Sequence, residues 1–145
     1  MIEVYTDGGC SGNPGPGGWA YVVVSGDAPE EKWGAESSTT NNRMELQAVI
    51  AALEALSGTD TSSGITVYTD SQYVQKGITL WIKDWKKKGW KTSDKKPVKN
   101  QDLWQRLDAL SGALPVAWRW VKGHAGNKYN ERCDFLTQKA IASLR

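Results

Sequence analysis

The stretch IEVYTDGG at residues 2–9 decides the fold class, because an alternating apolar strand there meets two glycines at Asp7. The stretch ITVYTDS at residues 65–71 repeats the arrangement and places Asp70 at the end of a second strand. If these strands pair in parallel, both carboxylates lie at the carboxyl edge of an α/β sheet, where such sheets bind ligands. Paired anionic oxygens suit hard cations such as Mg²⁺ or Mn²⁺. The sequence therefore predicts metal-assisted chemistry.

The composition is typical of a globular protein. The chain has 145 residues, of which 39% are hydrophobic and 23% are charged, so its length suits one domain. No apolar run approaches the roughly 18 residues of a membrane span, and the N-terminus begins in a strand pattern rather than a signal pattern. Cys10 and Cys133 match no zinc spacing and are expected to be reduced. We therefore expect a cytoplasmic monomer with no membrane partner.

The charge is distributed unevenly along the chain. The net charge is +2, yet residues 81–104 contain eight lysines and three aspartates and so carry +5. We call residues 81–104 the basic segment. A basic segment in a chain whose remaining residues are mildly acidic indicates a localised contact with a polyanion. Trp81 and Trp85 lie four residues apart on one helical face, so a place in the core is as plausible for each as a place on a binding surface.

The hydrophobic periodicity predicts an α/β fold with a five-stranded mixed sheet flanked by helices. Strands are expected at 2–6, 18–25, 32–37, 65–69 and 116–121. Helical stretches are expected at 43–56, 71–76, 80–87, from about 101 to 111, and at 127–143. The run GNPGPGG at residues 12–18 has the composition of a turn, and residues 88–100 are expected to form a basic loop.

Four acidic residues occupy positions from which they could meet at one sheet edge: Asp7, Glu45, Asp70 and Asp134. Each has an ordinary alternative. Asp7 suits a turn, Asp70 a helix cap, and Glu45 a capping box with Asn42, while Asp134 suits a solvated helix face. Taken together, two strand ends, a helix first turn and a helix behind a glycine-flanked loop favour convergence. Four carboxylates are the usual complement for two divalent ions that clamp an in-line phosphoryl displacement.

Several segments, in this order, resemble the bacterial type 1 ribonucleases H, which cut RNA within RNA/DNA hybrids. They are YTDGGCSGNPG (5–15), TNNRMEL (40–46), YTDSQYV (68–74), and GHAG (123–126) with NERCD (130–134). They span nearly the whole chain. The resemblance implies a ribonuclease H-like fold in a single catalytic domain, residues 1–145. One departure follows Asp134, where the chain reads Phe135-Leu136-Thr137 and related bacterial enzymes tend to have Glu-Leu-Ala.

The resemblance also implies a mechanism. Its metal ligands would be Asp7, Glu45, Asp70 and Asp134, holding two Mg²⁺ ions with substrate bound, or Mn²⁺ as a substitute. Cleavage would leave 5′-phosphate and 3′-hydroxyl ends. His124, the only histidine, lies on a glycine-bounded loop. Its imidazole can exchange a proton near neutral pH, so we expect it to assist proton transfer or product departure.

The resemblance assigns each strand of the hybrid to a different part of the chain. Short polar side chains beside the metal ligands would contact 2′-hydroxyls of the RNA in the shallow minor groove: Cys10, Asn13, Thr40, Asn41, Asn42 and Gln72. The alternative for the asparagines is a role in turns and caps. The basic segment would contact the DNA strand without reading its sequence, through Trp81, Trp85, Lys86, Lys87, Lys88 and Trp104.

Two other functions agree with parts of the sequence. An exonuclease or resolvase of the same superfamily would share the acidic residues, but the histidine loop and the basic segment favour a ribonuclease H. A binding module without catalysis would gain nothing from four acids beside phosphates. We therefore expect a hybrid-specific endoribonuclease.

Overall fold

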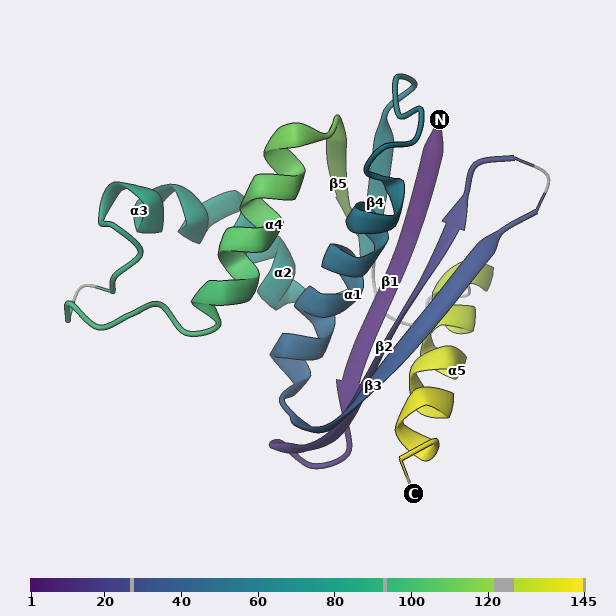
Figure 1. Ribbon diagram of the computed structural model, residues 1–145, viewed down its shortest axis with the longest axis horizontal. Helices are drawn as coiled ribbons and strands as arrows, with labels where there is room; N and C mark the ends of the chain where they lie inside the picture. Colours follow the sequence, from purple (N-terminus) through teal and green to yellow (C-terminus); the bar gives the residue numbers. More distant parts are fainter. Residues whose placement is uncertain (27, 93, 122–126, 145) are drawn as a thin grey trace.

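A mixed sheet forms the centre of the molecule in the computed structural model, which describes residues 1–26, 28–92, 94–121 and 127–144 (Figure 1). Its five strands have the order β3-β2-β1-β4-β5 within these ranges. β1 (Ile2–Cys10) and β3 (Glu30–Thr39) pair antiparallel with β2 (Gly15–Val24). β4 (Ile65–Thr69) pairs in parallel with both β1 and β5 (Val116–Trp120). The predicted five-stranded mixed α/β sheet is confirmed.

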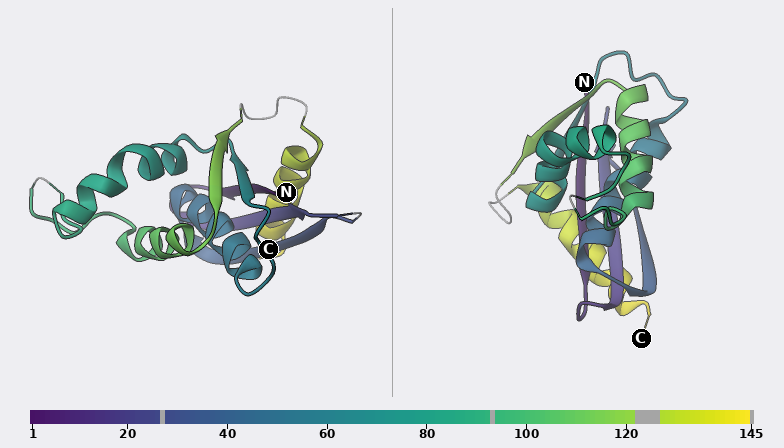
Figure 2. Two further views of the ribbon diagram at one scale, coloured as in Figure 1. Left: turned by 90° about the horizontal axis from the view of Figure 1, so that it is seen from above. Right: turned by 90° about the vertical axis from the view of Figure 1, so that its left-hand side faces the viewer.

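Helices cover both faces of the sheet. α1 (Asn41–Leu56) and α4 (Gln101–Ala113) lie on one side, and α5 (Lys128–Ala142) packs against β1, β2 and β3 on the other (Figures 1 and 2). Successive side chains of a strand point to opposite faces. Val4 therefore joins the core beneath α1, whereas Tyr5 joins a smaller cluster beneath α5. No helix in the described residues is long and apolar enough to cross a membrane.

The basic segment projects away from the sheet on the side of α1 and α4 (Figures 1 and 2). α2 (Gln72–Lys76) and a π-helical turn, η1 (Gly77–Trp81), lead into it, and α3 (Ile82–Lys87) forms its first part. The sequence predicted two separate helices, but the helical run is continuous. The ring of Trp104 fills the space where a Cβ on Gly77 would lie, so the π-helical turn packs directly on α4.

The first hairpin is longer than its glycines suggest. β1 continues through Cys10, and residues 15–18 belong to β2 rather than to the predicted turn. The reason is cross-strand pairing, because Asp7 lies opposite Ala20 and Cys10 lies opposite Gly17. Asp7 is therefore a strand residue, and its alternative role in a turn is wrong.

Candidate active site

The parallel register of β1 and β4 places two predicted metal ligands at the same level of the sheet. Tyr5 lies opposite Tyr68 in this register. Asp7 and Asp70 each follow two residues later, at the edge where β4 ends. Both acids are half-buried. The juxtaposition expected from the two TD sequences is therefore present.

Glu45 joins this edge from α1, where it is the fifth residue of the helix. The helix approaches β1 so closely that a Cβ on Gly8 would overlap its backbone. One carboxylate oxygen of Glu45 accepts a hydrogen bond from Asn41 Nδ2 at 3.1 Å, and the other accepts from Ser71 Oγ. Burial raises the pKa of Glu45 and the charge of Asp70 adds to the rise, while the hydrogen bonds from Ser71 and Asn41 lower it. Glu45 is thus held against the end of β4.

The electrostatics of Asp7 bring the fourth acid into the site. Burial is the main cause that raises the pKa of Asp7 to about 7, and the hydroxyl of Thr137 opposes it. The charges of Asp70, Asp134 and Glu45 each raise it further. The three other acids therefore all act on Asp7, so the four carboxylates gather at this edge, as the sequence predicted.

This donor set suits a hard divalent cation. It offers only carboxylate oxygens as charged groups, and the charges of Asp70, Asp134 and Glu45 add to the burial that raises the pKa of Asp7, a repulsion that a cation would relieve. No three acidic, histidine or cysteine side chains in the described ranges are gathered tightly enough to chelate an ion as they stand. Binding would have to draw the carboxylates together.

The helix caps near the site are not made by the acids. Thr40 caps α1 and Ser71 caps α2, each accepting from the backbone N–H three residues further on, at 3.3 Å and 3.1 Å. Asn42 lies inside α1, so a capping box between it and Glu45 is wrong. The alternative of Asp70 as a cap is wrong as well.

Comparison with known proteins decides the family. The family model for RNase H matches residues 1–142. The chain belongs to the ribonuclease H family. A curated relative, Ribonuclease H of Treponema denticola, is 58% identical over 157 residues, covering 99% of this chain and 98% of that protein. At this similarity over the full length, the protein is a ribonuclease H enzyme.

Solved structures of ribonucleases H share the fold. LC9-RNase H1, described as a type 1 RNase H with the type 2 active-site motif, matches with a TM-score of 0.86 and 36% identity. The match covers 99% of this chain and 73% of that one. LC11-RNase H1, solved in complex with an RNA/DNA hybrid, matches with a TM-score of 0.77 and 24% identity over 99% of both chains. The ribonuclease H-like fold is confirmed.

The residues predicted to face the RNA strand lie around the same sheet edge. Asn13 Oδ1 accepts the backbone N–H of Asn41 at 3.3 Å. The thiol of Cys10 donates to the backbone carbonyls of Gly15 at 3.2 Å and Thr39 at 3.3 Å. The remaining predicted contacts lie at the starts of α1 and α2: Thr40, Asn42 and Gln72. Their contact with RNA stays a prediction.

The prediction that Trp104 contacts substrate is wrong. Its side chain is fully buried, and its indole N–H donates to the hydroxyl of Tyr73 at 3.0 Å. α4 turns this ring toward the core because its apolar face packs against the body of the molecule. Trp81 and Trp85 are half-buried in the same aromatic cluster, with 5.5 Å between the ring centroids of Trp85 and Trp104. They anchor the base of the basic segment, and their contact with substrate stays a prediction.

The lysines predicted to contact DNA are exposed. Lys86 Nζ lies 3.3 Å from Asp108, and Lys88 Nζ lies 3.3 Å from Asp84. Lys87 has no ion-pair partner within the described part of the chain. Exposed ion pairs of this kind contribute little to stability, so the lysines remain available to a polyanion.

Three residues near the site were not predicted from the sequence. Ser71 holds Glu45 by a hydrogen bond. The hydroxyl of Thr137 is fully buried and forms no well-aligned hydrogen bond among the described residues, but it lies near enough to the Asp7 carboxylate to lower its pKa. The only sequence feature that pointed to Thr137 was the difference from related bacterial enzymes at residues 135–137. Arg43 joins α1 to the start of α4. It lies within the motif at residues 40–46 but received no role from the sequence. His124 lies outside the described residues.

Proposed function

We propose that this enzyme hydrolyses the RNA strand of RNA/DNA hybrids with the help of two divalent cations, Mg²⁺ or Mn²⁺. The convergence of Asp7, Glu45, Asp70 and Asp134 carries the proposal: the parallel register aligns Asp7 with Asp70, Ser71 holds Glu45 at the end of β4, and the charge of Asp134 acts on Asp7. The family name and the full-length similarity to a curated Ribonuclease H support the substrate class. LC11-RNase H1, a protein of the same fold, is bound to such a hybrid.

The acids of this chain would hold the cations at the sheet edge. When bound, such ions supply activation of a water molecule and stabilisation of the leaving oxygen. The parallel register fixes Asp7 beside Asp70, and the hydrogen bonds from Asn41 and Ser71 orient both oxygens of Glu45. Cleavage by attack of water on the phosphorus would leave 5′-phosphate and 3′-hydroxyl ends. His124 would assist proton transfer or the departure of product.

Hybrid specificity would come from contacts on both strands. Polar side chains beside the acids, such as Asn13 and Asn41, would accept and donate to 2′-hydroxyls of the RNA. The exposed lysines of the basic segment would bind phosphates of the DNA strand. Because neither kind of contact reads base edges, cleavage should be independent of sequence.

A cleavage assay with four labelled duplexes or strands tests the proposal. RNA/DNA hybrid, duplex RNA, single-stranded RNA and duplex DNA are each incubated with Mg²⁺ or with EDTA. We expect cleavage of the hybrid alone, and only with Mg²⁺. Ligation of the products with and without phosphatase treatment identifies the 5′-phosphate. Comparable cleavage of duplex RNA, or cleavage in EDTA, would overturn the proposal.

Two substitutions tie the activity to the acids. Asp70→Asn should abolish cleavage while the variant stays folded, because the amide keeps the shape of the side chain but removes its charge. Asp60→Asn is the matched control, since Asp60 lies on the exposed loop before β4 and hydrogen-bonds only to Ser62 among the described residues. It should cleave hybrid at the wild-type rate. Substantial activity in a folded Asp70→Asn would contradict the assignment.

A further inference from the structure

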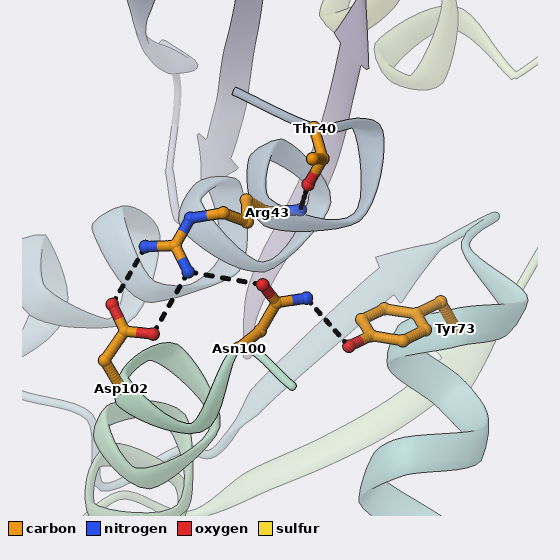
Figure 3. Close-up of polar contacts among 5 residues, drawn as sticks. All are labelled: Thr40, Arg43, Tyr73, Asn100 and Asp102. Carbon is orange, nitrogen blue, oxygen red and sulfur yellow. Dashed lines mark hydrogen bonds and ion pairs between the residues drawn. The ribbon is translucent and has the colours of Figure 1, made fainter. Parts of the chain in front are cut away.

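A polar network joins three elements at the base of the basic segment (Figure 3). Arg43 on α1 forms a two-pronged pair with Asp102 on α4, with N–O distances of 2.8 Å and 3.1 Å. The same guanidinium donates to Asn100 Oδ1 at 3.2 Å. Asn100 Nδ2 donates to the hydroxyl of Tyr73 on α2 at 3.0 Å, and that hydroxyl also accepts from the buried indole of Trp104.

Asn100 has an unusual conformation for its position. It is the N-cap residue of α4, where an asparagine normally accepts a backbone N–H of the first turn. Here its side chain makes no cap hydrogen bond and its backbone is left-handed, with φ of 61°. The side chain instead bridges Arg43 and Tyr73. The start of α4 therefore lacks the stabilisation of a side-chain cap. This cost indicates that the bridge between Arg43 and Tyr73 has a functional role.

The network connects the two parts of the chain that are proposed to contact opposite strands of the substrate. Arg43 lies in the first turn of α1, two residues before Glu45 on the same helix. Asn100 and Asp102 lie where the basic segment returns to the body. A planar guanidinium with several fixed donors holds two elements in a defined relative orientation better than a single point charge does.

We propose that Arg43 is a positioning residue that sets the distance between the acidic edge and the basic segment to match an RNA/DNA hybrid. The proposal rests on the proposed function. Arg43 acts through Asp102 and Asn100 rather than on the reacting phosphate. Loss of the Arg43 side chain should weaken simultaneous binding of the RNA and DNA strands and leave the chemistry at the acids intact.

Arg43→Lys and Asp102→Asn test this role. The lysine keeps the positive charge but cannot form the two-pronged pair, and Asp102→Asn keeps Arg43 but removes its partner. Each should raise KM for hybrid by about tenfold, with kcat within about twofold of wild type, as for losing one well-formed charged contact. Hybrid affinity measured in Ca²⁺, which suppresses turnover, should fall in parallel. The double variant should be no worse than either single one.

The matched control joins the same two helices at another point. Arg106 on α4 pairs with Glu54 on α1 at 2.7 Å, outside the basic segment and with no hydrogen bond to Asn100 or Tyr73 among the described residues. Arg106→Lys should leave KM unchanged. If Arg43 instead bound a phosphate directly, Arg43→Lys would retain most of the affinity and Asp102→Asn would tighten binding. That result, or an equal loss in Arg106→Lys, would overturn the inference. Failure of the wild-type enzyme to cut hybrid would instead overturn the proposed function.

Discussion

Tyr5 on β1 and Tyr68 on β4 stack face to face, with 4.8 Å between ring centroids and 8° between ring planes. Tyr129, in the first turn of α5, packs against Tyr5 with a centroid distance of 5.2 Å. Asp7 and Asp134 lie on the same elements as Tyr5 and Tyr129, and Asp70 directly follows the strand of Tyr68. Aromatic rings bury large areas and tolerate little displacement. This packing therefore fixes the spacing of three of the four acids from outside the site.

Asp7→Asn should abolish cleavage and stabilise the fold. Because the pKa of Asp7 rises from 3.8 to about 7 on folding, the folded protein binds this proton more tightly than the unfolded chain does. Stability therefore falls as pH rises from about 4 to about 7, and the full penalty, at most about 4 kcal/mol, applies above pH 7. We expect a higher Tm for the variant above pH 7 in EDTA, with the gain shrinking toward pH 4.

The control for this effect is Asp60→Asn. Hydrogen bonds from Ser62 lower the pKa of Asp60, which is the opposite direction, so its removal should bring no gain in Tm. An unchanged Tm in Asp7→Asn across this pH range would show that Asp7 is not destabilised by burial and by its acidic neighbours.

Thr137→Val should move the acidic limb of the pH–rate profile to higher pH. Burial raises the pKa of Asp7 and the Thr137 hydroxyl opposes that rise, so removing the hydroxyl raises the pKa further. Valine keeps the shape of the side chain in the packed helix. The loss of kcat/KM should grow as pH falls below 7, and Thr137→Ser should restore the wild-type profile. A uniform loss at every pH would indicate a packing defect instead.

Neutralising Lys86, Lys87 and Lys88 together should raise KM for hybrid much more than it lowers kcat. Each lost phosphate contact should reduce the slope of log affinity against log salt concentration by roughly one. Stability should change little, because the ion pairs of these lysines are exposed. The control neutralises Lys32 and Lys139, which lie on β3 and α5. An equal change in salt slope per lysine removed in the two variants would show that only total charge matters.

Gly77→Ala should destabilise the fold by about 1–3 kcal/mol, since the new methyl group would overlap the buried ring of Trp104. Gly112→Ala in α4 is the matched control. A Cβ there meets nothing within 4 Å, so alanine should stabilise the helix by up to about 1 kcal/mol. Urea unfolding of both variants gives the comparison. A neutral Gly77→Ala would contradict the close packing of η1 on α4.

The acidic positions could be read from the sequence because their signals are local. Strand alternation before Asp7 and Asp70 needs only neighbouring residues, and so does the apolar stripe of the helix that carries Glu45. Once a parallel pair of strands was inferred, the meeting of their ends followed from the geometry of such sheets. The basic character of residues 81–104 is likewise a property of composition alone.

The location and contacts of individual side chains depended on residues distant in the chain. Trp104 resembles its neighbouring tryptophans in sequence, and only the packing of α4 on Gly77 sends it into the core. Thr137 reaches Asp7 because α5 crosses β1, and Arg43 meets Asp102 across 59 residues. The sequence by itself determined which elements form and which residues carry charge, since both follow from short-range pattern. Only the tertiary structure decided which of those residues touch, because burial and pairing arise when separate elements pack together.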